Sequence, residues 1–218
     1  MVQTLAAKNL NLYDLEEKFN LQLNDDENFF PESRENLPEL NDLEKQTLDE
    51  VRENFRHLSK YPPLEAIVKL VVLSPLLRLA GFYRPPFYLV AEKEVKLDIE
   101  EEDTKITGRL DFLVFTPKFS VLAVETKGAK ASLYDGITQA LTYMLADANS
   151  QEPSYGFVTN GLEFLFLKLV NTSPPQYGES NGYLLRNPND IYLVLRILKR
   201  FANLVQQRAG KAIANGNV

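Results

Sequence analysis

Two acidic side chains and one lysine stand in neighbouring segments that have the composition of β-strands. Asp111 ends residues 108–111 (Gly-Arg-Leu-Asp), and residues 124–127 (Val-Glu-Thr-Lys) hold Glu125 and Lys127. Alternate residues of a strand share a face, so an aspartate from the next strand can reach the face of Glu125 and Lys127. Two carboxylates and one ammonium at a sheet edge make a site for a hard divalent cation and an attacking water.

The same residues have a plainer interpretation. A glutamate two residues before a lysine in a strand is most often a charge pair on a solvated face, and Asp111 could pair with Arg109 or cap a hairpin. Short motifs often match by accident. The surrounding elements therefore have to distinguish a site from a solvated surface.

Composition excludes several classes of protein. The 218 residues suffice for one domain with a sizeable core, and 44% hydrophobic content is ordinary for a soluble globular protein. Without cysteine there is no disulfide and no Cys-ligated zinc, and His57 as the only histidine excludes multi-histidine metal sites. No apolar run reaches membrane-spanning length. We expect a cytoplasmic protein without membrane contact.

The formal net charge of -6 is unevenly distributed. Residues 14–53 are acidic, and residues 186–211 are basic apart from Asp190. This balance argues against a protein that coats nucleic acid, although local basic surface remains compatible with a nuclease. We interpret the basic C-terminal helix as a solvated face rather than a DNA track.

The N-terminal third predicts two helices. Residues 1–36 are polar, acidic and weakly periodic, with a loop at residues 24–28. Asn41 and Glu44 have the spacing of a capping box, and the helix that they begin stops at the Tyr-Pro-Pro of residues 61–63. Its apolar stripe comprises Leu43, Leu48, Val51, Phe55 and Leu58. A second helix, from residue 63 or 64 to residue 79, is apolar nearly all round and is expected to be buried.

Strands and helices then alternate to the end of the chain. Strands are expected at residues 88–97, 105–115 and 121–125, the last an apolar run typical of a central strand. Turns are expected at residues 100–103 and 116–118. There follow a helix at 133–147, strands at 155–159 and 163–169 joined by Asn160-Gly161, a loop at 177–181, a helix at 190–207 and a frayed tail at 210–218.

This order predicts an α/β fold around one mixed sheet flanked by helices. We divide the chain into an acidic N-terminal segment, residues 1–62, whose helix packs on the core, and a main domain, residues 63–218, closed by the C-terminal helix. Helices at both ends are additions to the central unit.

The strand aspartate, the Glu-Thr-Lys of the next strand, and the helix and strand that follow resemble the PD-(D/E)XK nuclease superfamily. The similarity covers roughly residues 64–169. Gln139 and Tyr143 match the QxxxY motif of the RecB-like branch and of type I restriction R subunits, and residues 61–65 and 79–83 resemble cyanobacterial proteins of that kind. The resemblance implies a restriction-endonuclease-like fold.

The resemblance also implies a site. The superfamily has a glutamate on the helix before the strands, for which Glu65 is the best match and Glu53 the alternative. Asp111 follows leucine where the motif has proline, and the aspartate is the ligand. Asp111, Glu125 and Glu65 would then bind Mg²⁺ or Mn²⁺.

The remaining motif residues would assist the same reaction. Lys127 would orient the nucleophile or stabilise developing charge. Gln139 and Tyr143 lie on one helical face and would contact DNA or brace the metal ligands. Glu65 also suits the first turn of any helix, and Tyr143 suits any core.

Three hypotheses compete. The preferred one is a metal-dependent DNA nuclease, catalysed by Asp111, Glu125, Lys127 and Glu65. The second is a catalytically silent nucleic-acid-binding or regulatory module of the same fold, and the third is an oligomerisation protein. Candidate partners are DNA, other restriction-system subunits and a second copy of the chain.

Overall fold

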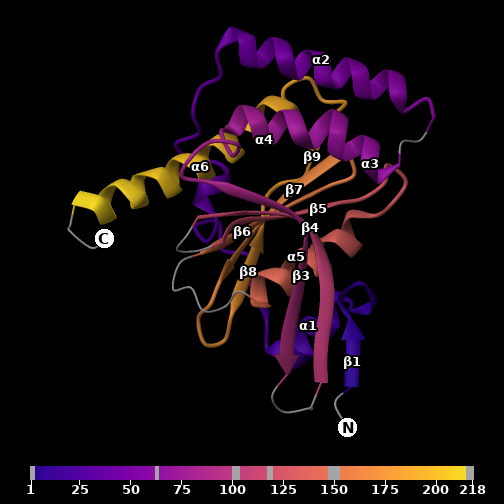
Figure 1. Ribbon diagram of the computed structural model, residues 1–218, viewed down its shortest axis with the longest axis vertical. Helices are drawn as coiled ribbons and strands as arrows, with labels where there is room; N and C mark the ends of the chain where they lie inside the picture. Colours follow the sequence, from indigo (N-terminus) through magenta and orange to yellow (C-terminus); the bar gives the residue numbers. More distant parts are fainter. Residues whose placement is uncertain (1–2, 62–63, 100–103, 117–119, 147–152, 215–218) are drawn as a thin grey trace.

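The computed structural model describes residues 3–61, 64–99, 104–116, 120–146 and 153–214, in which one mixed sheet carries helices on both faces (Figure 1). In chain order the elements are β1 (Gln3–Ala6), η1 (Ala7–Asn9), α1 (Leu12–Phe19), β2 (Gln22–Leu23), η2 (Pro31–Ser33), α2 (Asp42–Leu58), α3 (Glu65–Val68), η3 (Lys69–Leu73), α4 (Ser74–Ala80), β3 (Tyr88–Ile99), β4 (Thr104–Phe115), β5 (Ser120–Thr126), α5 (Leu133–Ala146), β6 (Ser154–Thr159), β7 (Glu163–Val170), β8 (Gln176–Glu179), β9 (Tyr183–Leu184) and α6 (Asp190–Ala214).

The central unit of the sheet follows the predicted order. Strands β3, β4 and β5 form an antiparallel meander, α5 crosses over, and β6 lies parallel to β5. The helix from α3 to α4 precedes the meander, and β7 follows β6 as a hairpin. The predicted fold class, a restriction-endonuclease-like mixed sheet flanked by helices, is confirmed.

Two hydrophobic cores lie on opposite faces of this sheet. Along β7, Phe164 and Phe166 pack in a first core with α2, α3 to α4 and α6. Leu165 and Leu167 pack in a second core with α1 and α5. The two-residue alternation of a strand produces this division. Because both faces are covered, the central strands are apolar on both sides.

Helix α2 begins where the sequence predicts. The side chain of Asn41 accepts a hydrogen bond from the Glu44 amide, and the Glu44 carboxylate accepts one from the Asn41 amide, both at 2.9 Å. Three residues of the predicted apolar stripe are buried. The prediction is wrong for both ends of the stripe, Leu43 and Leu58, which are exposed. In the first turn Glu44 rather than Leu43 is on the buried face of the helix.

The second predicted helix runs unbroken from α3 to α4, with η3 as a π-helical turn in its middle. Pro75 cannot donate a backbone hydrogen bond, and the wide turn lies just before it. Leu70 points outward and is 67% exposed, so the expectation of a helix buried all round is wrong there.

Other segments also differ from prediction. Strands β1 and β2 and helix α1 lie within residues 1–36, where we expected only polar, weakly periodic chain, and β8 occupies the predicted loop at 177–181. Strands β1 and β2 are short and pair in parallel with β4 and β8, so distant partners define them. The division at residue 62 stays a prediction. Residues 100–103, 117–118, 147 and 215–218 lie outside the described residues.

Helix α6 continues to Ala214, past the predicted end at residue 207 and through part of the predicted tail. Its apolar side, which includes Ile191, Leu198 and Phe201, lies in the first core. Among the helices in the described part of the chain, none is both long and apolar enough to cross a membrane.

The sheet forks along one edge of β4. Strand β3 pairs with β4 over almost its whole length, so the other edge is shared by two strands. Strand β5 pairs with residues 112–115, and β1 pairs with residues 104–107. The described ladders leave residues 108–111 between these two partners. Asp111 therefore lies where β5 departs from β4.

Gly161, in the turn between β6 and β7, lets α2 approach the sheet closely. Its φ is 84°, and an added Cβ atom would lie 2.5 Å from the Phe55 ring. We predict that Gly161→Ala lowers the free energy of unfolding by about 1–3 kcal/mol, through backbone strain and overpacking. Urea denaturation measures this loss. The matched control is Gly182→Ala, whose Cβ meets no atom within 4 Å, and equal losses in the two variants would contradict the prediction.

Candidate active site

Strand β4 changes its facing at Asp111. Leu110 packs in the second core, but Phe112 packs against the first, although residues two apart on a regular strand share a face. The β3–β4 register passes over Glu92 and Asp111, since Ala91 pairs with Phe112 and Lys93 with Leu110. Glu92 has a φ of 52°, which is uncommon for residues other than glycine. The irregularity places the Asp111 side chain between α3 and β5.

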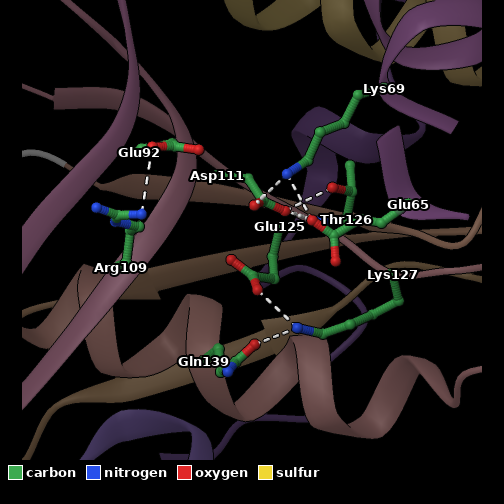
Figure 2. A network of polar contacts seen from close by, with 9 residues as sticks. All are labelled: Glu65, Lys69, Glu92, Arg109, Asp111, Glu125, Thr126, Lys127 and Gln139. Atoms are coloured by element: carbon green, nitrogen blue, oxygen red, sulfur yellow. Dashed lines mark hydrogen bonds and ion pairs between the residues drawn. The ribbon is translucent and has the colours of Figure 1, made fainter. Parts of the chain in front are cut away.

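The Asp111 carboxylate accepts hydrogen bonds from the helix layer and from β5 (Figure 2). Lys69 Nζ donates to Oδ1 at 2.6 Å. The amide and the hydroxyl of Thr126 donate to Oδ2 at 2.6 and 2.5 Å. The β4–β5 ladder ends one residue pair earlier, so this carboxylate serves the Thr126 amide in place of a strand partner. Lys69 also pairs with Glu65 at 2.5 Å, which brings the helix glutamate beside Asp111.

The side chain of Glu125 is only 5% exposed. Its Oε1 accepts a hydrogen bond from Lys127 Nζ at 2.7 Å, and the same ammonium donates a short hydrogen bond to Gln139 Oε1. The other oxygen of Glu125, Oε2, is buried without a hydrogen-bond partner. A buried acceptor of this kind is costly and therefore calls for an explanation.

Helix α5 approaches Glu125 closely because of Gly136. A Cβ atom added to Gly136 would lie 2.4 Å from Val158 Cγ1 and 3.7 Å from both Glu125 Cγ and Lys127 Cε. Glycine is thus required for this packing. Gln139, about one turn further along α5, can then reach Lys127 (Figure 2).

Burial dominates the electrostatics of the site. Burial, with a smaller effect from the Asp111 charge, raises the pKa of Glu125 to about 7, although Lys127 and, to a lesser extent, the backbone amide of Asp111 oppose the shift. Burial lowers the pKa of Lys69, but hydrogen bonds to Asp111 and Glu65 and the charges of these two acids outweigh it. The pKa of Lys69 is consequently raised.

A cleft of about 420 Å³ adjoins these groups at the fork. Gln139 lines it and also contacts Lys127, so the cleft borders the polar group, although Asp111, Glu125 and Lys127 are not among its lining residues. Tyr143 lies deeper in the wall, and burial raises the pKa of its hydroxyl. The exposed cations Lys8 and Arg109 and the exposed acid Glu94 line the same cleft, and Glu92 pairs with Arg109 at 3.3 Å.

The structure brings most predicted site residues together. Asp111, Glu125, Lys127 and Gln139 lie in one group, with Glu65 joined to it through Lys69 (Figure 2). The alternative helix residue, Glu53, is exposed on α2, so the geometry favours Glu65. The catalytic role of these residues stays a prediction.

Sequence reasoning missed two members of this group. Thr126 donates hydrogen bonds to Asp111 from both its amide and its hydroxyl. The motif does not specify the residue type between Glu125 and Lys127, so it gives no sign of this contact. Lys69 lies four residues after Glu65 on a predicted helix, a spacing that places the two side chains together. That spacing could have revealed the ion pair, though not its contact with Asp111.

The donor set fits a hard divalent cation on one observation, the buried and unpartnered Oε2 of Glu125. Within the described residues, however, no three His, Cys, Asp or Glu side chains are grouped as a metal site. Lys69 stands between Glu65 and Asp111 and keeps that pair occupied. Glu125, with its unpartnered oxygen, is therefore the candidate ligand that the geometry favours most, and Asp111 would join it only through a lone-pair position that Lys69 and Thr126 leave open.

Comparison with known proteins gives little similarity. No protein-family model matches the chain, and no curated protein matches it. One similar solved structure is a fragment assigned as an HsdR subunit of a type I restriction enzyme from Vibrio vulnificus. It is 20% identical, with a TM-score of 0.38 over 60% of this chain and 25% of that one. The matched region thus spans a quarter of that chain.

The raised pKa of Glu125 predicts a specific pH dependence of stability. The folded chain binds the Glu125 proton more tightly than the unfolded chain, so this group stabilises the fold at low pH. That contribution is lost as pH rises from about 4.5 to about 7. Relative to Glu125→Gln, the wild type should lose unfolding free energy over this range, by at most about 1.4 kcal/mol per pH unit.

Chemical denaturation in EDTA from pH 5 to pH 8 measures this difference. Glu53→Gln, which removes an exposed carboxylate of α2, is the matched control for loss of one acid. A difference between wild type and Glu125→Gln that stays constant from pH 5 to pH 7 would show that the buried carboxyl titrates as it does in the unfolded chain.

Proposed function

We propose that this protein is a metal-dependent nuclease that hydrolyses phosphodiester bonds of DNA. The observation that carries the proposal is the meeting of Asp111, Glu125 and Lys127 at the fork. There the second acid has a buried oxygen free to accept a ligand. The element order of the fold supports the same proposal.

Each residue has a role that its surroundings support. Asp111 and Glu125 would hold Mg²⁺ or Mn²⁺, and such a cation supplies Lewis acidity and lowers the pKa of a bound water. Lys127 places a positive charge beside Glu125, where it would stabilise charge that develops on phosphate oxygens. Gln139 fixes the position of that ammonium.

The cleft at the fork offers a path for the substrate. Its lining has two cations, Lys8 and Arg109, and one acid, Glu94, together with Gln139 and Tyr143. Phosphate groups of a nucleic acid would be attracted to the two cations. DNA as the substrate, other restriction-system subunits as partners, a homodimer and a cytoplasmic location remain parts of this proposal.

A silent nucleic-acid-binding module is the second candidate. The ion pairs of Lys69 with Glu65 and Asp111 favour it, since a resident ammonium contacts both acids and compensates one of their two negative charges. Salt-dependent DNA binding without metal-dependent cleavage would support this candidate over the first.

We predict that Asp111→Asn, Glu125→Gln and Lys127→Ala each reduce the rate of DNA cleavage by about 100-fold or more. Each variant removes a charge that acts in the transition state. The measurement is nicking of plasmid and cutting of single-stranded DNA with Mg²⁺ or Mn²⁺. Lys45→Ala, an exposed lysine of α2, is the control. Equal cleavage by wild type and Lys127→Ala on every substrate would refute the assignment.

A further inference from the structure

We propose that the ammonium of Lys69 occupies the place between Glu65 and Asp111 that a divalent cation would otherwise take, and so competes with metal. The inference rests on the proposed function, and it identifies Lys69 as a residue of the same site that limits metal binding. Lys69 Nζ lies 2.5 Å from Glu65 Oε1 and 2.6 Å from Asp111 Oδ1. A Mg²⁺ ion bound to such oxygens lies about 2.0–2.1 Å from each, so ion and ammonium exclude one another.

The hydrogen bonds of Asp111 leave little room for a second cation. A carboxylate offers about four lone-pair positions. Thr126 takes two of the positions at Oδ2 through its amide and hydroxyl, and Lys69 takes one at Oδ1. A metal ion therefore either uses the single remaining position or displaces Lys69. Displacement would free Glu65 at the same time.

The position of Lys69 is built into the fold. The residue begins the π-helical turn η3, four residues after Glu65, and π-helical turns are frequent at functional sites. Its Nζ lies 5.9 Å from the centre of the Phe112 ring, and its side chain is only 25% exposed. The surroundings thus hold the ammonium at the two acids.

The formal charges of the site also indicate that Lys69 competes with a metal ion. Three carboxylates, those of Glu65, Asp111 and Glu125, face two ammonium groups, those of Lys69 and Lys127. Without Lys69, one ammonium would face three carboxylates, and the uncompensated charge would match that of a divalent ion. Lys69 therefore reduces the number or the affinity of the cations that the site binds.

The test is Mn²⁺ binding to the full chain by isothermal titration calorimetry. Lys69→Met should bind Mn²⁺ at least about tenfold more tightly than wild type, or bind one more ion, because the competing charge is gone. Lys69→Arg keeps the charge and should resemble wild type. Lys45→Met, which removes an exposed lysine of α2, controls for net charge.

A second measurement, of melting temperature, keeps the test decisive if Lys69→Met folds too poorly for calorimetry. In EDTA, Lys69→Met leaves Glu65 and Asp111 uncompensated and should unfold at a lower temperature than wild type. Mn²⁺ should then raise its melting temperature more than it raises that of wild type. Lys69→Gln should behave in the same way if Lys69→Met is insoluble.

The outcomes separate the two proposals. If wild type binds Mn²⁺ through Asp111 and Lys69→Met binds no better, the competition is refuted and the proposed nuclease stands. If only Lys69→Met binds, the competition is supported and metal-dependent action of the wild type is refuted. If neither binds, both proposals fail.

Discussion

The site depends on the carboxylate of Asp111, which joins three parts of the fold. One of its oxygens receives the Lys69 ammonium from the helix layer of the first core, and the other receives two donors from Thr126 on β5. Strand β5 has already left β4 at this point, so no regular ladder secures the Thr126 amide. Loss of the carboxylate would leave the buried Thr126 amide without its acceptor and Lys69 with Glu65 as its remaining acid partner, a larger penalty than loss of one surface ion pair.

The charges around Asp111 are not arranged for stability. Glu125 is buried in a site where its negative charge raises the cost of folding at neutral pH, and one of its oxygens has no partner. Buried ion pairs such as Glu125 with Lys127 often contribute nothing net, because desolvation offsets their attraction. Residues that break local rules without a stabilising return are expected mainly at functional sites.

Sequence reasoning was most successful where the pattern is local. The capping box of Asn41, the apolar runs of the central strands and the alternation that joins Glu125 to Lys127 all follow from spacing within a few residues. Strands β1 and β2 were missed because pairing in parallel with distant strands creates them, and each has four residues or fewer. Strand β8 also has only four residues, and it pairs with β7 as well as with the distant β2. The contact between Lys69 and Asp111 spans 42 residues and two element types, so no periodicity contains it.

The fork explains why the two helix layers meet at one point. Elsewhere the sheet separates the two cores, but at the fork a residue from each layer holds one acid: Lys69 holds Asp111, and Gln139 acts on Glu125 through Lys127. The charge balance of the site is therefore set jointly by α3 to α4 and by α5. A shift of either layer against the sheet would change which of the two acids keeps its ammonium partner.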